Sequence, residues 1–254
     1  MATHLDSSDA KTIIKFILVS IIISAVTLVM GAAAHLLSQS YEDALAHTDE
    51  AAVLVVIDAG HGGEDGGCVG VDGTLEKTIN LDVATRVRDI LSCAGIKCVM
   101  TRTDDTMLYD IYGDLTDYSG KKKMYDLKNR LRMGEEHRDA VFVSIHMNSF
   151  PQSSCEGVQI YYSPNSPESA LLADTVRSSV KAYLQPKNER ETKRAGTSIY
   201  ILNRITRPAI LAECGFLSNP NECAALNSDS YKQELALCIA SAIAEYVSSA
   251  AQPK

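Results

Sequence analysis

Two histidines and one glutamate each stand at the end of a short apolar run or within a few residues after it. These residues and their runs are His61 after 53–57, His146 after 140–145 and Glu213 after 209–212. Such runs predict buried strands, and reactive groups of α/β proteins gather at the carboxyl ends of parallel strands. Two imidazoles combined with carboxylates from separate elements are typical of a catalytic zinc that keeps one position open for water.

The residues around the two histidines are consistent with this interpretation. Gly60 precedes His61, and glycine allows the backbone to approach a neighbouring group closely. Asp58, Ser144 and Asn148 are placed where they would fix the tautomers of the two rings. They are explained nearly as well as ordinary polar groups at strand ends.

Two carboxylates are candidates for the remaining roles. Glu76 stands at the expected start of a helix, where it is either a metal ligand or an acid favoured by the helix dipole. Glu213 ends an apolar run, and burial would raise its pKa toward the range of a general base. Cys214 suggests a thiol nucleophile instead. However, alternation along a strand sends Cys214 to the face opposite Glu213, which argues against that role.

The apolar pattern predicts strands that alternate with helices. The expected strands are 53–58, 97–101, 140–145, 157–162, 198–202 and 209–213, and the expected helices are 75–94, 126–137, 167–184 and 230–250. Such alternation predicts one α/β domain whose mostly parallel sheet carries helices on both faces.

The N-terminal region differs in composition from the rest. Residues 16–34 carry no charge and would span roughly 28 Å as a helix, close to the thickness of a bilayer core. Lys11 and Lys15 precede them, so the positive-inside rule places the N-terminus in the cytoplasm. We predict a cytoplasmic segment 1–15, a transmembrane helix 16–37 that anchors the protein to the cell membrane, a linker 38–51 and an extracytoplasmic catalytic domain 52–250. A cleaved signal peptide is the alternative, since small residues occupy 31–34.

Charge and cysteine content narrow the classes of function. A net charge of −8 argues against nucleic-acid binding, which needs a basic face. The seven cysteines form no CxxC pair, so we expect most of them to be small buried hydrophobic residues rather than a disulfide framework.

Four motifs together resemble the zinc-dependent N-acetylmuramoyl-L-alanine amidases. They are residues 55–63, Glu76, residues 144–148 and residues 213–219, and the resemblance extends over about residues 52–248. It implies a twisted sheet flanked by helices, Zn²⁺ held by His61, Glu76 and His146, and Glu213 as the catalytic glutamate. One departure is Gly134, where family members often carry Asn.

The resemblance also implies a substrate and a setting. The substrate would be peptidoglycan, cleaved between muramic acid and L-alanine, with Asn148, Lys193 and Arg194 as candidate substrate-binding residues. Lys193 and Arg194 would meet stem-peptide carboxylates or simply form a solvated loop. The overall layout is similar to that of membrane-anchored sporulation amidases, which implies a deacetylase or activator partner. The alternatives are another zinc peptidase or deacetylase of the cell wall, and a non-catalytic wall-binding domain.

Overall fold

The computed structural model describes residues 27–28, 30–32, 35 and 53–250. The chain divides into two compact units, residues 1–51 and residues 52–254. The expected cytoplasmic segment and linker, and most of the expected anchor, lie outside the described residues. Among the described residues, no helix is both long enough and apolar enough to cross a membrane.

The second unit contains the sheet and the helices around it. Its strands are β1 (Leu54–Ala59), β2 (Cys98–Met100), β3 (Ala140–Asn148), β4 (Gln159–Tyr162), β5 (Lys193–Arg194) and β6 (Ala209–Phe216). Its helices are α2 (Glu76–Cys93), α3 (Lys122–Glu135), α4 (Glu168–Tyr183), α5 (Pro220–Leu226) and α6 (Asp229–Ala250). The expected α/β class is confirmed.

The strands form one six-stranded sheet in the order β2-β1-β3-β6-β4-β5. β1 pairs in parallel with β2 and β3, β3 with β6, and β4 with β5. β4 runs antiparallel to β6, so the sheet is mixed. The parallel neighbours β1, β3 and β6 therefore bring their carboxyl ends to the same edge, where the candidate site residues lie.

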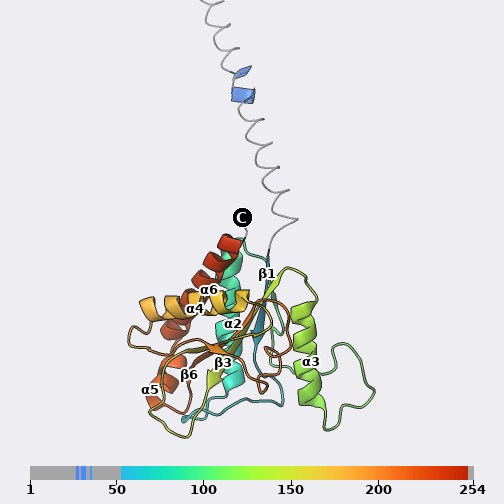
Figure 1. The fold of residues 1–254 in the computed structure, drawn as a ribbon, viewed down its shortest axis with the longest axis vertical. Coiled ribbons are helices and arrows are strands. Elements are labelled where there is room, and N and C mark those ends of the chain that lie inside the picture. Colours follow the sequence, from blue (N-terminus) through green and yellow to red (C-terminus); the bar gives the residue numbers. More distant parts are fainter. Residues whose placement is uncertain (1–26, 29, 33–34, 36–52, 251–254) are drawn as a thin grey trace, which may run out of the picture. The chain divides into compact units, whose positions relative to one another are not determined.

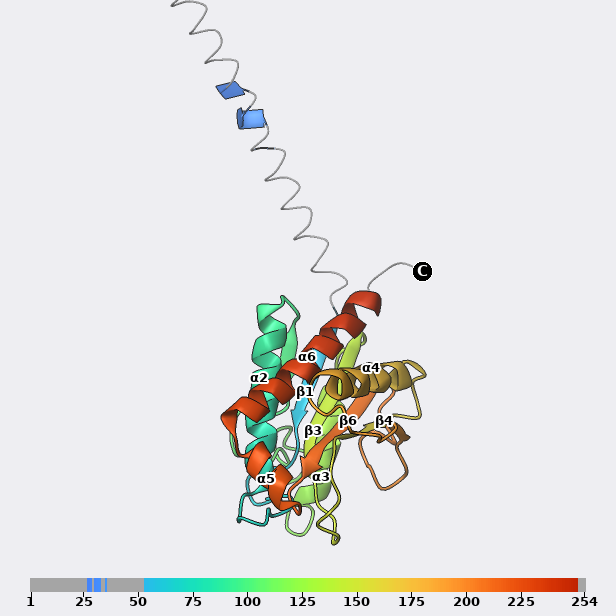
Figure 2. The ribbon, with the colours of Figure 1, turned by 90° about the vertical axis from the view of Figure 1, so that its left-hand side faces the viewer.

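Helices cover both faces of the sheet, as the alternating pattern predicts. Figures 1 and 2 show α2, α4 and α6 together on one face and α3 on the other. The larger core cluster lies under the three helices, and a smaller cluster lies on the α3 face. Both faces of the central strands are therefore covered, which explains their nearly continuous apolar sequences.

The face of the sheet under α3 changes character along each central strand. Residues of that face are apolar where the strands begin, as at Val56 and Phe142, which are fully buried in the smaller cluster. Two positions further along, the same face carries Asp58 and Ser144, and β3 continues to His146. Because side chains alternate with a period of two, these polar residues gather on one face at one edge.

One expected strand is wrong. Residues 198–202 form turns, although their apolar sequence is typical of a strand. The position beside β4 is taken by β5, so Lys193 and Arg194 lie in a short edge strand rather than before another strand. Ile201 and Leu202 are buried in the smaller core cluster, so burial against the α3 face explains their apolar character.

The departure at Gly134 has a packing reason. A Cβ atom at this position would lie 2.8 Å from the Phe142 ring and 2.9 Å from Ile205. Real Cβ atoms do not approach other atoms this closely, so a side chain would push α3 away from β3. Glycine here allows the helix to pack against the strand that carries His146.

Candidate metal centre

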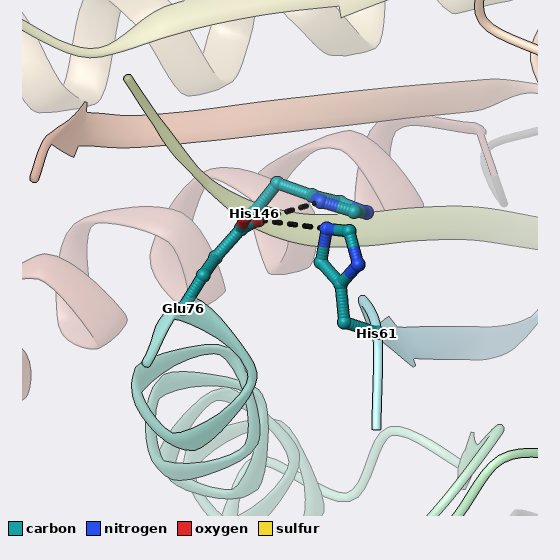
Figure 3. A group of neighbouring side chains, drawn as sticks. All are labelled: His61, Glu76 and His146. Carbon is teal, nitrogen blue, oxygen red and sulfur yellow. Dashed lines mark hydrogen bonds and ion pairs between the residues drawn. The ribbon is translucent and has the colours of Figure 1, made fainter. Parts of the chain in front are cut away.

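Three predicted ligands meet at the carboxyl edge of the sheet. His61 follows β1, Glu76 is the first residue of α2, and His146 lies in β3; their ligand atoms are within 4.8 Å of one another. Figure 3 shows both rings directed at the Glu76 carboxylate. Glu76 Oε1 lies 3.2 Å from His61 Nε2 and 2.9 Å from His146 Nδ1. Two imidazole nitrogens and a carboxylate oxygen are ligands that zinc accepts.

Glu76 is held in place by backbone N–H groups of the loop before α2 and of strand β3. Its Oε2 accepts a hydrogen bond from the Cys68 N–H at 2.8 Å, and its Oε1 accepts one from the Met147 N–H at 3.1 Å. Burial alone raises the pKa of Glu76, but hydrogen bonds with His146 and His61 outweigh it and hold that pKa far below its usual range. The group is therefore a carboxylate, the form that binds a metal.

His61 is fixed from its other side by Asp65. His61 Nδ1 lies 2.9 Å from Asp65 Oδ2, which leaves Nε2 free to face Glu76. Burial lowers the pKa of His61, but the hydrogen bonds with Asp65 and Glu76 outweigh it and raise the pKa to about 9. A carboxylate behind a histidine ligand orients the ring and sets its tautomer. The sequence analysis missed Asp65, although its place four residues after His61 was a usable signal.

Glycines give the two rings the space that they occupy. A Cβ atom at Gly60 would lie 2.3 Å from the His146 ring, and one at Gly67 would lie 2.8 Å from His61 Cδ2. His61 itself has a φ of 60°, in the left-handed region that residues with a Cβ rarely adopt. The loop geometry therefore depends on groups that hold the backbone around His61.

Two buried arginines hold this backbone through hydrogen bonds to its carbonyl groups. Arg130 of α3 donates to the carbonyl of His61 at 2.6 Å and to Asp58 Oδ1 at 2.7 Å. Arg102 donates to the carbonyls of Ala59 and Gly60 at 2.8 and 2.9 Å. Sequence reasoning missed both arginines, because nothing local marks an arginine as buried.

Asp126 completes the charge balance of Arg130. Its Oδ2 accepts a hydrogen bond from Arg130 Nε at 2.7 Å across one turn of α3. This spacing of four residues was the only local signal of the network. The pKa of Arg130 is raised: burial opposes the charge, but Asp58 and Asp126 outweigh it.

Glu213 lies beside the cluster, and Cys214 does not. Glu213 is the cross-strand partner of His146 and lines a cavity with it. Burial raises the pKa of Glu213, and its Oε2 is a buried atom without a hydrogen-bond partner among the described residues. Cys214 is fully buried in the core on the opposite face, where burial raises its thiol pKa. The argument from strand alternation is confirmed.

The comparisons with known proteins agree with this geometry. Residues 55–245 match the family described as N-acetylmuramoyl-L-alanine amidase. The chain belongs to the N-acetylmuramoyl-L-alanine amidase family. The match extends from β1 into α6, so it includes every element that carries a candidate ligand.

Individual amidases are similar over most of their length. The germination-specific N-acetylmuramoyl-L-alanine amidase of Bacillus subtilis is 34% identical over 200 residues, covering 79% of this chain and 82% of the relative. The CwlD amidase from Clostridioides difficile, solved in complex with the GerS lipoprotein, gives a TM-score of 0.71 at 35% identity and covers 78% and 99% of the two chains. The catalytic domain of CwlV, the N-acetylmuramoyl-L-alanine amidase from Bacillus (Paenibacillus) polymyxa var. colistinus, gives 0.62 at 34% identity and covers 77% and 98%.

The three candidate substrate-binding residues of this amidase lie in two strands, Asn148 in β3 with His146 and Lys193 and Arg194 in β5. Asn148 ends β3, and its Oδ1 accepts a hydrogen bond from the Ser149 N–H. Lys193 and Arg194 form β5 at the edge of the sheet, and both are exposed. Exposed cations on an edge strand fit either substrate contact or solvation, so their role stays a prediction.

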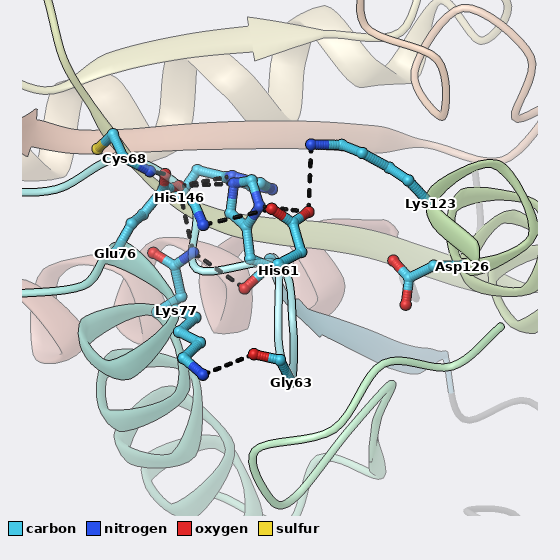
Figure 4. A network of polar contacts seen from close by, with 12 residues as sticks. His61, Gly63, Cys68, Glu76, Lys77, Lys123, Asp126 and His146 are labelled. Atoms are coloured by element: carbon cyan, nitrogen blue, oxygen red, sulfur yellow. Dashed lines mark hydrogen bonds and ion pairs between the residues drawn. The ribbon is translucent and has the colours of Figure 1, made fainter. Parts of the chain in front are cut away.

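Two lysines at the rim of the cluster were not singled out by the sequence. Figure 4 shows Lys77 and Lys123 around the loop that carries His61. Lys77 Nζ donates to the Gly63 carbonyl at 2.7 Å, and Lys123 Nζ lies 3.3 Å from Asp65 Oδ2. These contacts tie the loop to the start of α2 and to α3.

Proposed function

We propose that this member of the amidase family is a zinc hydrolase that cleaves the amide between the lactyl group of N-acetylmuramic acid and L-alanine. The observation that carries the proposal is the convergence of His61, Glu76 and His146 beside Glu213, a half-buried residue whose buried Oε2 has no hydrogen-bond partner among the described residues. Membership of the amidase family indicates which bond is cleaved, and the cluster of candidate metal ligands indicates how it is hydrolysed.

His61 Nε2, His146 Nδ1 and a Glu76 oxygen would hold the zinc. The fit is supported by the donor set and by the hydrogen bonds that keep Glu76 ionised and aimed at both rings. When bound, zinc lowers the pKa of water toward neutrality and polarises the carbonyl of the substrate. Asp65 holds His61 in the tautomer that presents Nε2.

Glu213 is the residue that would move the proton. Its unpartnered Oε2 is available to accept a proton from the attacking water and to deliver it to the leaving amine of L-alanine. Burial raises the pKa of Glu213, so the protonated form is within reach during the reaction. The bond that breaks is the amide C–N bond, and the products are a lactyl carboxylate and a free amino terminus.

The cellular role that we propose is remodelling of the cell wall or spore cortex. Similarity to the germination-specific amidase and to CwlD supports this role. The lipoprotein in the CwlD complex supports the prediction that an accessory protein binds this chain too. A deacetylase that acts on the same glycan, and a membrane anchor within residues 16–37 that holds the catalytic unit outside the cell membrane, complete the proposal.

Product analysis tests the function. The full-length protein in detergent would be incubated with defined muropeptides, with and without a chelator, and the products identified by mass spectrometry. The proposal expects chelator-sensitive release of intact stem peptides with free L-alanine amino termini. Cleavage within the peptide or loss of acetyl groups would instead establish a peptidase or deacetylase. Bound zinc without any hydrolysis would favour a wall-binding domain.

A further inference from the structure

An apolar cavity adjoins Glu213 on the face of the sheet covered by α3. It has a volume of about 220 Å³ and is continuous with the metal cluster, because His146 and Glu213 both line it. Its deeper wall is formed by Phe142, Leu202 and Leu211. Phe142 and Leu202 are fully buried in the smaller core cluster, so this wall is part of the fold.

The turns at residues 198–202 form the side of the cavity away from the sheet. They are held by backbone hydrogen bonds from the Ile199 N–H to Gly196 and from the Ile205 N–H to Ile201. Ile199 is half-buried and lines the cavity, whereas Ile201 is buried. The turn segment is therefore a fixed wall of the cavity.

The position of Glu213 decides which part of the substrate faces this cavity. In the proposed function, on which this inference rests, Glu213 delivers a proton to the leaving amine. The carbon that carries that amine must then lie next to Glu213, and its side chain lies next to the cavity. The atom that makes the transfer, Oε2, is buried and free of partners among the described residues.

We propose that the cavity binds the side chain of the first stem-peptide residue and admits apolar side chains larger than the methyl of alanine. An apolar cavity of about 150 Å³ is large enough to bind benzene. A cavity of about 220 Å³ therefore exceeds what one methyl group fills. The enzyme accordingly accepts branched apolar residues at the first position and disfavours residues that place a polar group there.

A substrate series tests the proposal. Synthetic N-acetylmuramoyl peptides would carry glycine, L-alanine, L-2-aminobutyrate, L-valine or L-threonine at the first position, with the rest identical. For the full-length zinc-loaded protein we expect kcat/KM to rise about 10-fold from glycine to alanine and not to fall for aminobutyrate or valine. Threonine is the polar isostere of valine, so kcat/KM should be lower for the threonine substrate than for the valine substrate. Calorimetry with the released peptides should give Kd values in the same order.

Variants at Ile199 link the effect to this cavity. Ile199→Trp narrows the cavity and should lower kcat/KM for valine at least 10-fold more than for glycine. Ile199→Ala enlarges the cavity and should raise kcat/KM for valine further relative to glycine. Leu171→Trp is the matched control, because Leu171 is an exposed residue of α4 on the opposite face of the sheet.

The outcomes separate this inference from the proposed function. Hydrolysis of the alanine substrate with a steep loss for aminobutyrate and valine would overturn the inference and leave the amidase activity standing. An unchanged substrate ranking in both Ile199 variants would likewise overturn the inference alone. Failure to hydrolyse any of the peptides would overturn the proposed function and the inference together.

Discussion

The two histidines of the cluster differ in how they are held. His61 presents Nε2 to Glu76 and has Asp65 behind its other nitrogen, whereas His146 presents Nδ1 and packs over Gly60. One ring is therefore oriented by a carboxylate and the other by close packing against backbone. Glu213 differs from both, because its buried Oε2 has no hydrogen-bond partner among the described residues, which fits the proton transfer that we propose for it.

Substitutions of Glu213 and of His146 should have different effects on turnover and zinc content. Glu213→Gln removes the proton carrier but no metal ligand, so we expect kcat to fall by roughly 10²–10⁴-fold with zinc content unchanged. His146→Ala removes a ligand and should lose both zinc and turnover. Metal analysis alongside kinetics on the same preparations distinguishes the two, and full activity of Glu213→Gln would remove its assigned role.

A substitution of Asp65 should lower the affinity for zinc rather than change the chemical step directly. Asp65→Asn weakens the support behind His61, and loss of such a partner lowers metal affinity roughly 10–100-fold. Zinc competition with a chromophoric chelator measures this directly. Glu64→Gln is the matched control, because the neighbouring Glu64 is exposed and pairs with Lys122 rather than with a ligand. Equal affinities for the two variants would contradict the prediction.

At the scale of elements, the site depends on the junction of β1 with α3. Burial alone raises the pKa of Asp58, but Arg130 and the Ser144 hydroxyl outweigh it and hold that pKa below its usual range. The ionised pair joins the end of β1 to α3, and the same guanidinium holds the carbonyl of His61. A helix on the far side of the sheet from α2 thus fixes the loop that carries a ligand.

Removing Arg130 should destabilise the fold and weaken the site together. Arg130→Gln leaves Asp58 and Asp126 buried without their cation, and breaking a buried pair in this way costs about 3–5 kcal/mol. Urea unfolding of the metal-free protein measures the loss. Lys128→Gln, an exposed position in the same helix, should change stability by less than about 0.5 kcal/mol. An unchanged unfolding midpoint for Arg130→Gln would refute the role of the network.

At the scale of the whole molecule, we expect metal binding and folding to be coupled. The three candidate ligands come from the loop after β1, the start of α2 and β3, so only the folded second unit brings them together. A ligand that binds only the folded state stabilises it, by about 2.7 kcal/mol at a concentration 100 times its Kd. Metal binding also requires neutral histidine, which makes the effect depend on pH.

The stability of the metal-free protein and the additional stabilisation by zinc should change with pH in opposite directions. In the metal-free protein, the pKa of His61 is raised to about 9 from an ordinary value of 6.5. Its contribution to stability is therefore full below about pH 6.5 and is lost as the pH rises through about 9. Zinc must displace that proton, so the stabilisation by zinc should grow as the pH rises toward about 9. Thermal melts with and without zinc at several pH values check both trends, and a constant zinc effect would contradict them.

Much of this architecture could be predicted from local patterns. Apolar runs followed by His61, His146 and Glu213 indicated the edge of the sheet at which the site lies, because period-two alternation and burial are local properties of a strand. The helices α2, α4 and α6 begin and end within one residue of the expected bounds, because their apolar stripes are long. The start of α5 had a readable signal too: Asn219 caps it, and Pro220 is its first residue.

The sequence by itself therefore determined the class of fold, the types of the candidate ligands and the strand ends that carry them. Tertiary structure alone decided which partners those residues meet. Residues 198–202 have the apolar pattern of a strand, but β5 occupies the place beside β4, and the segment forms the wall of a cavity instead. Arg130 and Arg102 look like surface cations until β1 and the His61 loop present carbonyls and carboxylates to them. Pairing and burial of charge depend on residues distant in sequence, so no local pattern encodes them.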